Sequence, residues 1–336
     1  MARRFVAFGE LLLRLDAKGY SRFVQAEEFT ARYTGAEANV AVSLSGFGWE
    51  TWAVSKVPEH EIGQACINGL RRHGVNVEHV VRGGERLGLL YLETGASQRP
   101  TKVIYDRGHS SFSEALPEEF DWARILEGKD WLHFAGTAPA LGPGIVRILE
   151  DGLRMARKLG VTVSCDSNYR SKLWSVEEAA RVLSGLLGSV DVFVGGRGDA
   201  ERLFGIAAEP GASPDDAAAA QARELCRRFG FRAVAMTLRE GASASVNRLA
   251  GLFCLDGHCH VSRRHEIAIV DRIGGGDAFT AGIIHGLGSG WDGQDVAEFA
   301  AAASCLKHSI PGDFNLVTAE EVQDLIRGDG GGRVRR

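Results

Sequence analysis

Two adjoining segments carry most of the information in this sequence: His265–Val270, HEIAIV, and directly after it Asp271–Gly282, DRIGGGDAFTAG. The first six residues have the apolar, β-branched content of a strand, and an apolar helical pattern follows the three glycines and the acid. Three successive glycines remove every Cβ at the start of a helix, so main-chain N–H groups can surround an anion there. Asp277 would repel a bound phosphate, but it suits a site in which its carboxylate faces an attacking hydroxyl. A simple helix cap at Asp277 is the alternative interpretation, and the loop alone does not separate the two.

Strands and helices alternate along most of the chain, which predicts an α/β fold with a mostly parallel sheet covered on both faces. The predicted strands are 4–9, 51–57, 130–135, 161–165, 190–194 and 232–238. The predicted helices are 36–47, 61–73, 143–159, 175–187, 214–229, 276–288, 293–308 and 318–327. Two strand-rich excursions, at about 10–35 and 86–108, leave this body and are expected to pair into a small sheet over its edge. In open parallel sheets ligands bind at the carboxyl ends of the strands, where such a flap would fall.

Composition narrows the class of protein. The 336 residues are 45% hydrophobic and 24% charged, so a large core can be buried, and the net charge of −4 gives no footprint for nucleic acid or an anionic membrane. The apolar run near the N-terminus is broken by charged residues, so no signal peptide is expected, and no stretch approaches a membrane span of about 18 residues. The six cysteines form no C-x-x-C pair, which predicts reduced thiols in a cytoplasmic protein. Cys254, His258, Cys259 and His260 fall on opposite faces of an expected exposed hairpin at Asp256-Gly257, so a zinc site is not predicted.

Two motifs resemble the signatures of one enzyme family. Asp271–Asp277, DRIGGGD, resembles the C-terminal D-T-x-G-A-G-D signature of the PfkB (ribokinase-like) carbohydrate kinases, and Thr34–Ala41, TGAEANVA, resembles their N-terminal G-G-x-x-x-N-x-A signature. The resemblance covers about residues 4–327. It implies a ribokinase-like three-layer α/β/α body with a small β-sheet lid, formed by a single domain over 1–327 and followed by a flexible tail at 328–336.

Within that family the likeness is greatest to the 2-keto-3-deoxygluconate kinases. It rests on the segments 35–39 (GAEAN), 103–107 (VIYDR), 166–174 (DSNYRSKLW) and 311–313 (PGD). The resemblance implies ATP-dependent phosphorylation of the terminal hydroxyl of this sugar acid. A kinase for fructose, 2-keto-3-deoxygalactonate or 5-keto-2-deoxygluconate, and a non-catalytic sugar-binding sensor, are the alternatives.

The resemblance also implies roles for individual residues. Asp277 is the expected catalytic base, with Gly274, Gly275 and Gly276 as the anion hole. The expected substrate residues are Gly35, Asn39, Tyr91, Tyr105, Arg107, Arg170 and Asp313. The expected nucleotide residues are Asn168, Thr237, Arg239 and Gly241, together with Gly274 and Gly276, and Asp199 is the expected metal ligand.

Elementary chemistry supports the acid substrate independently. A carboxylate needs a planar, permanently charged donor, and Arg107 and Arg170 both follow strands expected to end near the cleft. Tyr91 and Tyr105 offer an apolar wall with a polar tip. The alternatives are a surface role for each arginine and a cross-strand aromatic pair for Tyr91.

The chain departs from the family pattern on the metal and nucleotide side. Gly196–Asp199 reads GRGD where the family has N-x-x-E, Arg272 and Gly275 replace the usual Thr and Ala, and the segment 237–244 (TLREGASA) lacks the second glycine of the usual G-x-x-G. ATP and Mg²⁺ are still the expected cofactors, and dependence on a monovalent cation is left open. Exposed lid edges favour a homo-oligomer.

Overall fold

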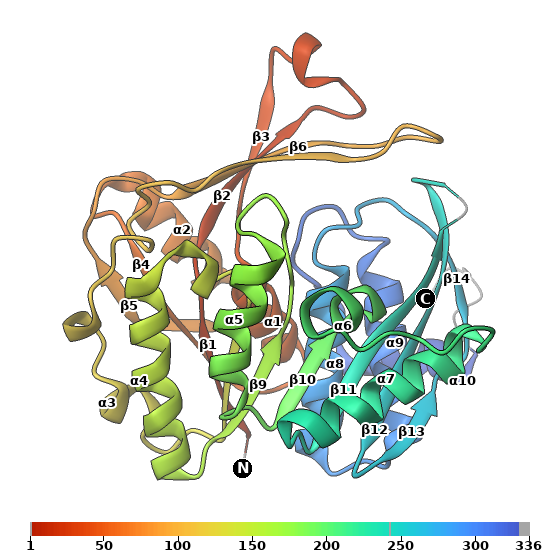
Figure 1. Cartoon of the computed structure of the whole chain (residues 1–336). Coiled ribbons are helices and arrows are strands. Elements are labelled where there is room, and N and C mark those ends of the chain that lie inside the picture. The colour runs from red at the N-terminus through yellow and green to blue at the C-terminus, as the bar shows by residue number, and fades with distance from the viewer. Residues whose placement is uncertain (1, 242, 329–336) are drawn as a thin grey trace.

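The computed structural model describes residues 2–241 and 243–328, which form a large sheet and a small one (Figure 1). The large sheet runs β13-β12-β11-β10-β9-β8-β1-β4-β5, with β14 also paired to β12. Its strands are β1 (Arg4–Phe8), β4 (Glu50–Val57), β5 (Val75–Arg82), β8 (Trp131–Ala135), β9 (Thr162–Asp166), β10 (Val192–Gly195), β11 (Ala233–Gly241), β12 (Val246–Leu255), β13 (His258–Val261) and β14 (His265–Ala268). All pairs from β11 to β5 are parallel, and only the pairs of β12 are antiparallel.

Helices cover both faces of this sheet, because its strands are apolar on both sides. In β1, Val6 and Phe8 belong to one core and Phe5 and Ala7 to the other. The first core packs under α3 (Trp122–Leu126), α4 (Pro143–Leu159), α5 (Val176–Leu187), α6 (Arg197–Phe204) and α7 (Pro214–Phe229). The second packs under α1 (Ala36–Gly46), α2 (Glu61–Arg72), α8 (Gly275–Ser289), α9 (Gly293–Lys307) and α10 (Ala319–Arg327). The result is a three-layer α/β/α body.

Local sequence fixes where the helices begin and end. The Ser213 side chain accepts from the amide of Asp216 at the start of α7, and Pro214 occupies the first helical position, where no N–H is needed. Gly230 ends the same helix in the left-handed conformation (φ +77°), which costs glycine little.

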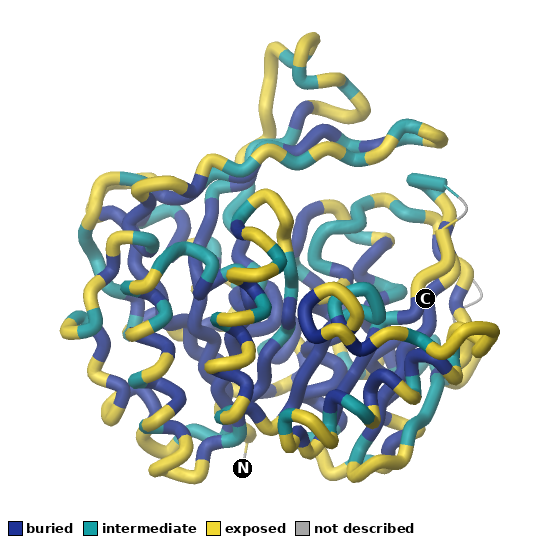
Figure 2. The backbone as a smooth tube through the Cα atoms, in the orientation of Figure 1, coloured by how far each residue is buried: buried dark blue, intermediate teal, exposed yellow. Residues whose placement is uncertain are grey.

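The small sheet is the lid, and it contains β2 (Leu12–Ala17), β3 (Phe29–Thr34), β6 (Gly88–Glu93) and β7 (Lys102–Asp106) in the order β3-β2-β6-β7. The short 3-10 helix η1 (Phe23–Gln25) joins β2 to β3. All four strands fall inside the two predicted excursions. Figure 2 shows the lid above the body, with buried and intermediate residues along β2 and β6 and exposed residues along the first half of β3. The tip of the lid reaches the body, because the amide of Ala244 donates to the carbonyl of Ser97 (3.0 Å).

The α/β fold with a mostly parallel sheet and a small lid sheet is therefore confirmed, and α4 and α7 have the predicted bounds. The strand β5 and the helices α3 and α6 were not predicted. The 3-10 helices η2 (Pro117–Glu119) and η3 (Pro139–Leu141) complete the elements. Residues 329–336 of the predicted tail lie outside the described part of the chain. None of the helices among the described residues is long and apolar enough to span a bilayer.

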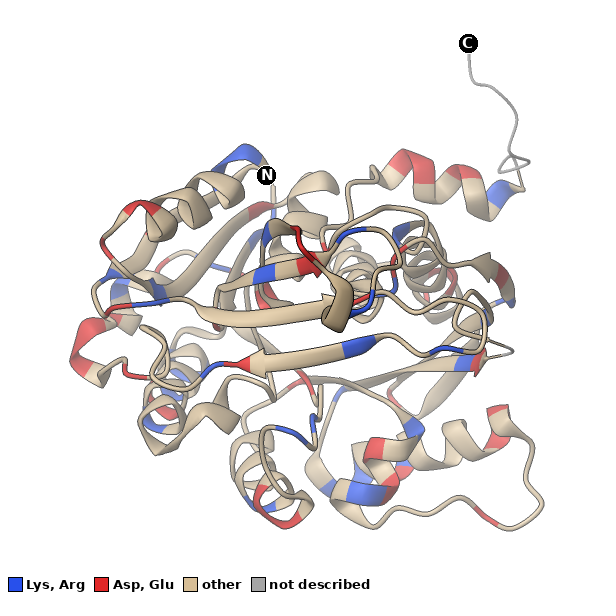
Figure 3. Cartoon of the chain, turned by 90° about the horizontal axis from the view of Figure 1, so that it is seen from above, with Lys and Arg blue, Asp and Glu red and all other residues tan. Residues whose placement is uncertain are grey.

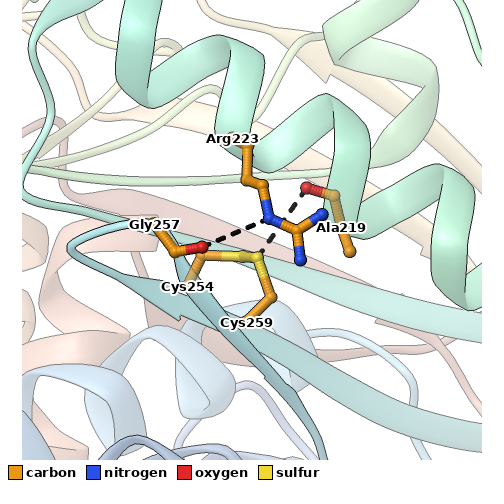
Figure 4. The surroundings of a disulfide bond; sticks show 5 residues. All are labelled: Ala219, Arg223, Cys254, Gly257 and Cys259. Carbon is orange, nitrogen blue, oxygen red and sulfur yellow. Dashed lines mark hydrogen bonds between the residues drawn. A yellow bond between two sulfur atoms is a disulfide. The ribbon is translucent and has the colours of Figure 1, made fainter.

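The expectation of six reduced cysteines is wrong for one pair. A disulfide joins Cys254 to Cys259 across the β12–β13 hairpin, beside the carbonyl of Ala219 on α7 (Figure 4). The hairpin turns at Asp256-Gly257 as predicted, but Cys254 is fully buried rather than exposed. The two residues lie directly opposite each other on the paired strands β12 and β13. A search of the sequence for C-x-x-C pairs cannot detect this proximity.

Candidate active site

A cavity of about 320 Å³ lies between the lid and the carboxyl ends of the body strands, where α/β sheets bind ligands. One wall comes from the lid and the start of α1: Leu12, Thr34, Gly35, Asn39, Leu90, Val103, Tyr105 and Arg107. The opposite wall follows β9, β10 and β11: Asp166, Asn168, Arg170, Gly195, Gly196, Asp199 and Thr237. Gly274, Gly276 and Asp277 lie at the amino end of α8 and line the same cavity.

The glycine-rich turn is shaped by close packing. Gly274 caps α8 with a φ of +81°, and a Cβ at this position would overlap the main-chain carbonyl of Asp313. Only glycine satisfies both demands. The first amides of α8 follow at once and have no acceptor inside the helix, so the turn presents N–H groups at the cavity.

Asp277 sits in the first turn of α8 and is almost completely buried. Its Oδ2 accepts a hydrogen bond of 2.6 Å from Asn39 Nδ2, on α1. Burial raises the pKa of Asp277 to about 6, while the Asn39 hydrogen bond and the charges of Arg170 and Lys307 act to lower it. A carboxylate with a pKa near the working pH can take up a proton during turnover.

A buried polar chain connects Asp277 to the lid. The Thr34 hydroxyl lies 3.2 Å from Asn39 Oδ1 and donates to the Asp313 carboxylate. Asp313 in turn forms an ion pair with Arg14, whose Nη2 lies 2.8 Å from Asp271 Oδ2. Arg14 is fully buried on lid strand β2, and no sequence motif marks it as a site residue. The ion pair between Arg14 and Asp271 thus links the lid to the Asp271–Asp277 loop.

Two more buried carboxylates were not predicted from the sequence. Glu10 forms an ion pair with Arg107 Nε and accepts from the Ser110 hydroxyl. Glu37 accepts from the amide of Ala135 (3.0 Å), and its burial raises its pKa to about 8. The helical pattern at 36–47 predicted α1, but the spacing of its apolar residues does not show that Glu37, the second residue of the helix, is buried.

Most of the predicted site residues line the cavity together: Asp277, Gly274, Gly276, Gly35, Asn39, Tyr105, Arg107, Arg170, Asp313, Asn168, Thr237 and Asp199. Arg107 is buried and tied to Glu10, whereas Arg170 is exposed and its Nη1 donates to the carbonyl of Tyr169 (3.1 Å). Asp313 lines the cavity but is already paired with Arg14.

Four predicted site residues lie elsewhere. Tyr91 alternates with Leu90, so its ring lies on the outer face of the lid and packs edge-on against Phe29 at 6.3 Å. This ring contact reaches across β2, which lies between β3 and β6, and a substrate role for Tyr91 stays a prediction. Gly275 does not line the cavity and packs where a Cβ would overlap the His308 ring.

Arg239 and Gly241 belong to the exposed end of β11, beyond the part that reaches the cavity. The Nη2 of Arg239 donates to His308 Nε2 (2.9 Å), and Gly241 lies beside Asn247 at a separate hollow. Among the described residues of the segment 237–244, Thr237 lines the cavity and the others do not, because β11 extends past it to pair with β12.

Asp199 opens α6 on the far wall of the cavity. Its Oδ2 accepts from the Ser167 hydroxyl (2.8 Å) and from the amide of Gly196 (3.3 Å). Within residues 2–241 and 243–328, no three His, Cys, Asp or Glu side chains converge to hold a metal ion. The nearby Asp166 carboxyl has its pKa raised to about 7 by burial and by the charge of Asp277.

Comparison with known proteins agrees with this geometry. Residues 2–316 match the model of the pfkB family of carbohydrate kinases. The chain belongs to the pfkB family. It is 33% identical over 334 residues to the 2-dehydro-3-deoxygalactonokinase of Haloferax volcanii, which covers 99% of both chains. It is 28% identical to the 2-dehydro-3-deoxygluconokinase of Bacillus subtilis, over 96% of this chain and 94% of the relative.

Solved structures of this family share the fold. The crystal structure of the 2-dehydro-3-deoxygluconokinase of Thermotoga maritima superposes with a TM-score of 0.95 at 46% identity, over 98% of this chain and 99% of that one. A pfkB family carbohydrate kinase from Listeria grayi superposes with a TM-score of 0.91 at 36% identity, over 97% and 100% of the two chains.

Proposed function

We propose that this protein transfers the γ-phosphoryl group of ATP to the terminal hydroxyl of 2-keto-3-deoxygluconate, also called 2-dehydro-3-deoxygluconate, to give the 6-phosphate. The observation that carries the proposal is one cavity that is lined by a buried carboxylate, by a helix start whose first amides have no acceptor inside the helix, and by two guanidinium groups. These groups belong to Asp277, the amino end of α8, Arg107 and Arg170. The 46% identity to the Thermotoga maritima enzyme supports the choice of sugar acid.

The chemistry follows from the residues. Asp277 takes the proton of the terminal hydroxyl as its oxygen forms a bond to the γ-phosphorus, and the bond from that phosphorus to the β,γ-bridging oxygen breaks to release ADP. Amides at the start of α8 donate hydrogen bonds to the oxygens of the γ-phosphoryl group during transfer, and these hydrogen bonds stabilise its negative charge. Arg170 binds the substrate carboxylate at the other end, with Arg107 held beside it by Glu10. The lid excludes water that would otherwise hydrolyse ATP.

On the wall from β9 to β11, the part lined by Asn168, Gly196 and Thr237 is the proposed nucleotide side. Arg170 belongs to the same wall and is assigned, together with the lid wall, to the sugar acid. Mg²⁺ keeps several waters and uses one or two carboxylates together with substrate phosphates, and Asp166 and Asp199 offer such oxygens. When bound with ATP, the ion would neutralise phosphate charge.

A second sugar acid is supported by one finding. The Haloferax volcanii relative is named for 2-dehydro-3-deoxygalactonate, which differs from the gluconate form only in configuration at C4. Both acids offer the same carboxylate and the same terminal hydroxyl, so the residues assigned above serve either of them.

Two variants test the assignment in a coupled assay of ADP release. Asp277→Asn should bind both substrates nearly as the wild type does and lose at least ~10² in kcat, the usual effect of removing a general base. Arg170→Ala should raise KM for the keto-deoxy acid steeply, while Arg154→Ala, an exposed change on α4, serves as the control. Near-normal turnover by Asp277→Asn would refute the base, and an unchanged KM in Arg170→Ala would refute the carboxylate site.

We also propose that residues 1–327 act as one cytoplasmic kinase domain that pairs with a second copy through the outer face of the lid. This face is apolar across its strands: Leu13, Leu15, Phe29, Ala31, Tyr33, Leu89, Tyr91 and Ile104. Phe29 and Ile104 are 42% and 51% exposed. Figure 3 shows charged positions on the lid strands, and the strand β7 has its charged residues, Lys102 and Asp106, at its two ends. Apolar patches of this kind mark contact surfaces.

A further inference from the structure

Lys307 is the last residue of α9, and its side chain is completely buried. A lysine is seldom found in this state, because removing an ammonium from water costs several kcal/mol unless polar partners surround it. The chemistry proposed above leaves Lys307 without a role, although it lies close enough for its charge to act on Asp277.

The partners of the ammonium are main-chain carbonyl oxygens. Lys307 Nζ donates to the carbonyl of Ile310 at 3.1 Å and faces the carbonyl of Asp271 at 3.4 Å. The carboxylates of Asp271 and Asp277 act on it favourably through charge, and Arg14 acts against it. Main-chain carbonyls beside carboxylates are also the surroundings that proteins give to alkali cations.

The two carbonyls belong to the two loops that shape the catalytic turn. Asp271 begins the loop that leads through Gly274 to Asp277, and Ile310 begins the segment that ends at Asp313. These loops touch where Gly274 packs on the Asp313 carbonyl. Asp271 adds a second link, since its Oδ2 accepts from the amide of Gly312 (2.9 Å). The Lys307 ammonium therefore closes the contact between the loops from inside the protein.

We infer that the Lys307 ammonium is a built-in monovalent cation, which positions the loop of Asp277 and makes the kinase independent of added K⁺ or Na⁺. Lys307 is a positioning residue, since it touches the loops and not the substrate. The inference rests on the proposed role of Asp277 as the base. It gives an answer to the question of monovalent-cation dependence that the sequence leaves open.

The test begins with the wild type in buffers that contain Mg²⁺ and whose only monovalent cation is tetramethylammonium, which is too large for the site. Addition of KCl, NaCl or NH₄Cl should leave kcat for the keto-deoxy acid unchanged. Stimulation of several-fold by K⁺ or NH₄⁺, at equal ionic strength, would overturn the inference.

Two variants then separate charge from volume. Lys307→Ala opens a cavity beside the carbonyls and should lower kcat by about 10- to 100-fold, the effect of losing a hydrogen-bonded charge. Ammonium, methylammonium or K⁺ should restore much of that loss. Lys307→Met fills the same space without a charge, so its loss should not be restored. Lys56→Ala, which removes a buried lysine paired with Glu119 away from the site, should gain nothing from the ions.

A readout besides activity keeps the inference separate from the proposed function. Ammonium should raise the melting temperature of Lys307→Ala more than that of Lys307→Met, and this comparison stands even if the wild type phosphorylates no sugar acid. A folded Lys307→Ala with wild-type kcat, or with a loss that no cation restores, would overturn the inference. If Lys307→Ala fails to fold without salt, refolding that depends on ammonium or K⁺ supports the inference, and refolding that ignores them contradicts it.

Discussion

The hydrogen bond from Asn39 to Asp277 allows the catalytic base to be tested by pH. The pKa of Asp277 is raised to about 6 by burial, and the Asn39 amide keeps it from rising further. Replacing Asn39 with Leu, which has a similar volume and no donor, removes this opposition. A hydrogen bond to a charged group contributes about 1.5–3 kcal/mol, and one pKa unit corresponds to about 1.4 kcal/mol. The pKa of Asp277 should therefore rise by about one to two units, to roughly 7–8.

The assay is the pH dependence of kcat/KM, which reports the free enzyme. In the wild type, kcat/KM should fall as the pH drops through about 6, because Asp277 becomes protonated. In Asn39→Leu the same limb should lie near pH 7–8, in addition to any loss of sugar binding that affects all pH values equally. Asn76→Leu, which removes an amide bonded to the carbonyl of Thr51 at a distant strand, should leave the limb in place. A limb that stays at the wild-type position in Asn39→Leu would refute this account of Asp277.

Three further outcomes follow from the structure. In urea unfolding at pH 8, Asp277→Asn should stabilise the protein by up to about 3 kcal/mol, because the raised pKa of Asp277 means that its ionised form costs folding stability above pH 6. The stabilisation should vanish near pH 4. A variant that is less stable than the wild type at pH 8 would contradict this prediction. Reduction of the Cys254–Cys259 disulfide, or the substitution Cys254→Ala, should lower the stability measured in thermal melts by about 2 kcal/mol, and Cys305→Ala serves as the control. A melting temperature that a reductant does not change would argue against the disulfide. Ile104→Glu should dissociate the proposed dimer in light-scattering measurements, whereas Leu159→Glu, on an equally exposed site of α4, should not; an oligomer that survives Ile104→Glu would exclude the lid face.

Much of the fold could be predicted because the strands and helices of the body have strong local patterns. The bounds of α4 and α7 follow from a proline at the start of each helix and a glycine after its end. β5 was missed because its exposed and buried residues alternate only over its first half, in the pattern of an edge strand. α6 is only eight residues long, which is too short for a helical period to be recognised.

Site residues that belong to a sequence motif could be predicted, whereas site residues that are brought together only by tertiary contacts could not. The glycines and Asp277 could be located because their spacing carries the chemistry. Tyr91 lies outside the cavity because neighbouring residues of a strand point to opposite faces, and the sequence does not show which face meets the cavity. Arg14, Glu37 and Lys307 are buried charges, and each has at least one partner that is distant in sequence and becomes a neighbour only in the folded structure.

The preferred substrate can be identified by comparing kcat/KM for ATP-dependent ADP release across ribose, fructose, gluconate, 5-keto-2-deoxygluconate and the two 2-keto-3-deoxy acids. A 2-keto-3-deoxy acid should be preferred, with the product phosphorylated at C6, and Arg170→Ala should remove most of this preference. Preference for a neutral sugar would contradict the assignment of the carboxylate site. Tight binding of a keto-deoxy acid without any turnover would contradict the kinase itself and favour a sugar-binding sensor.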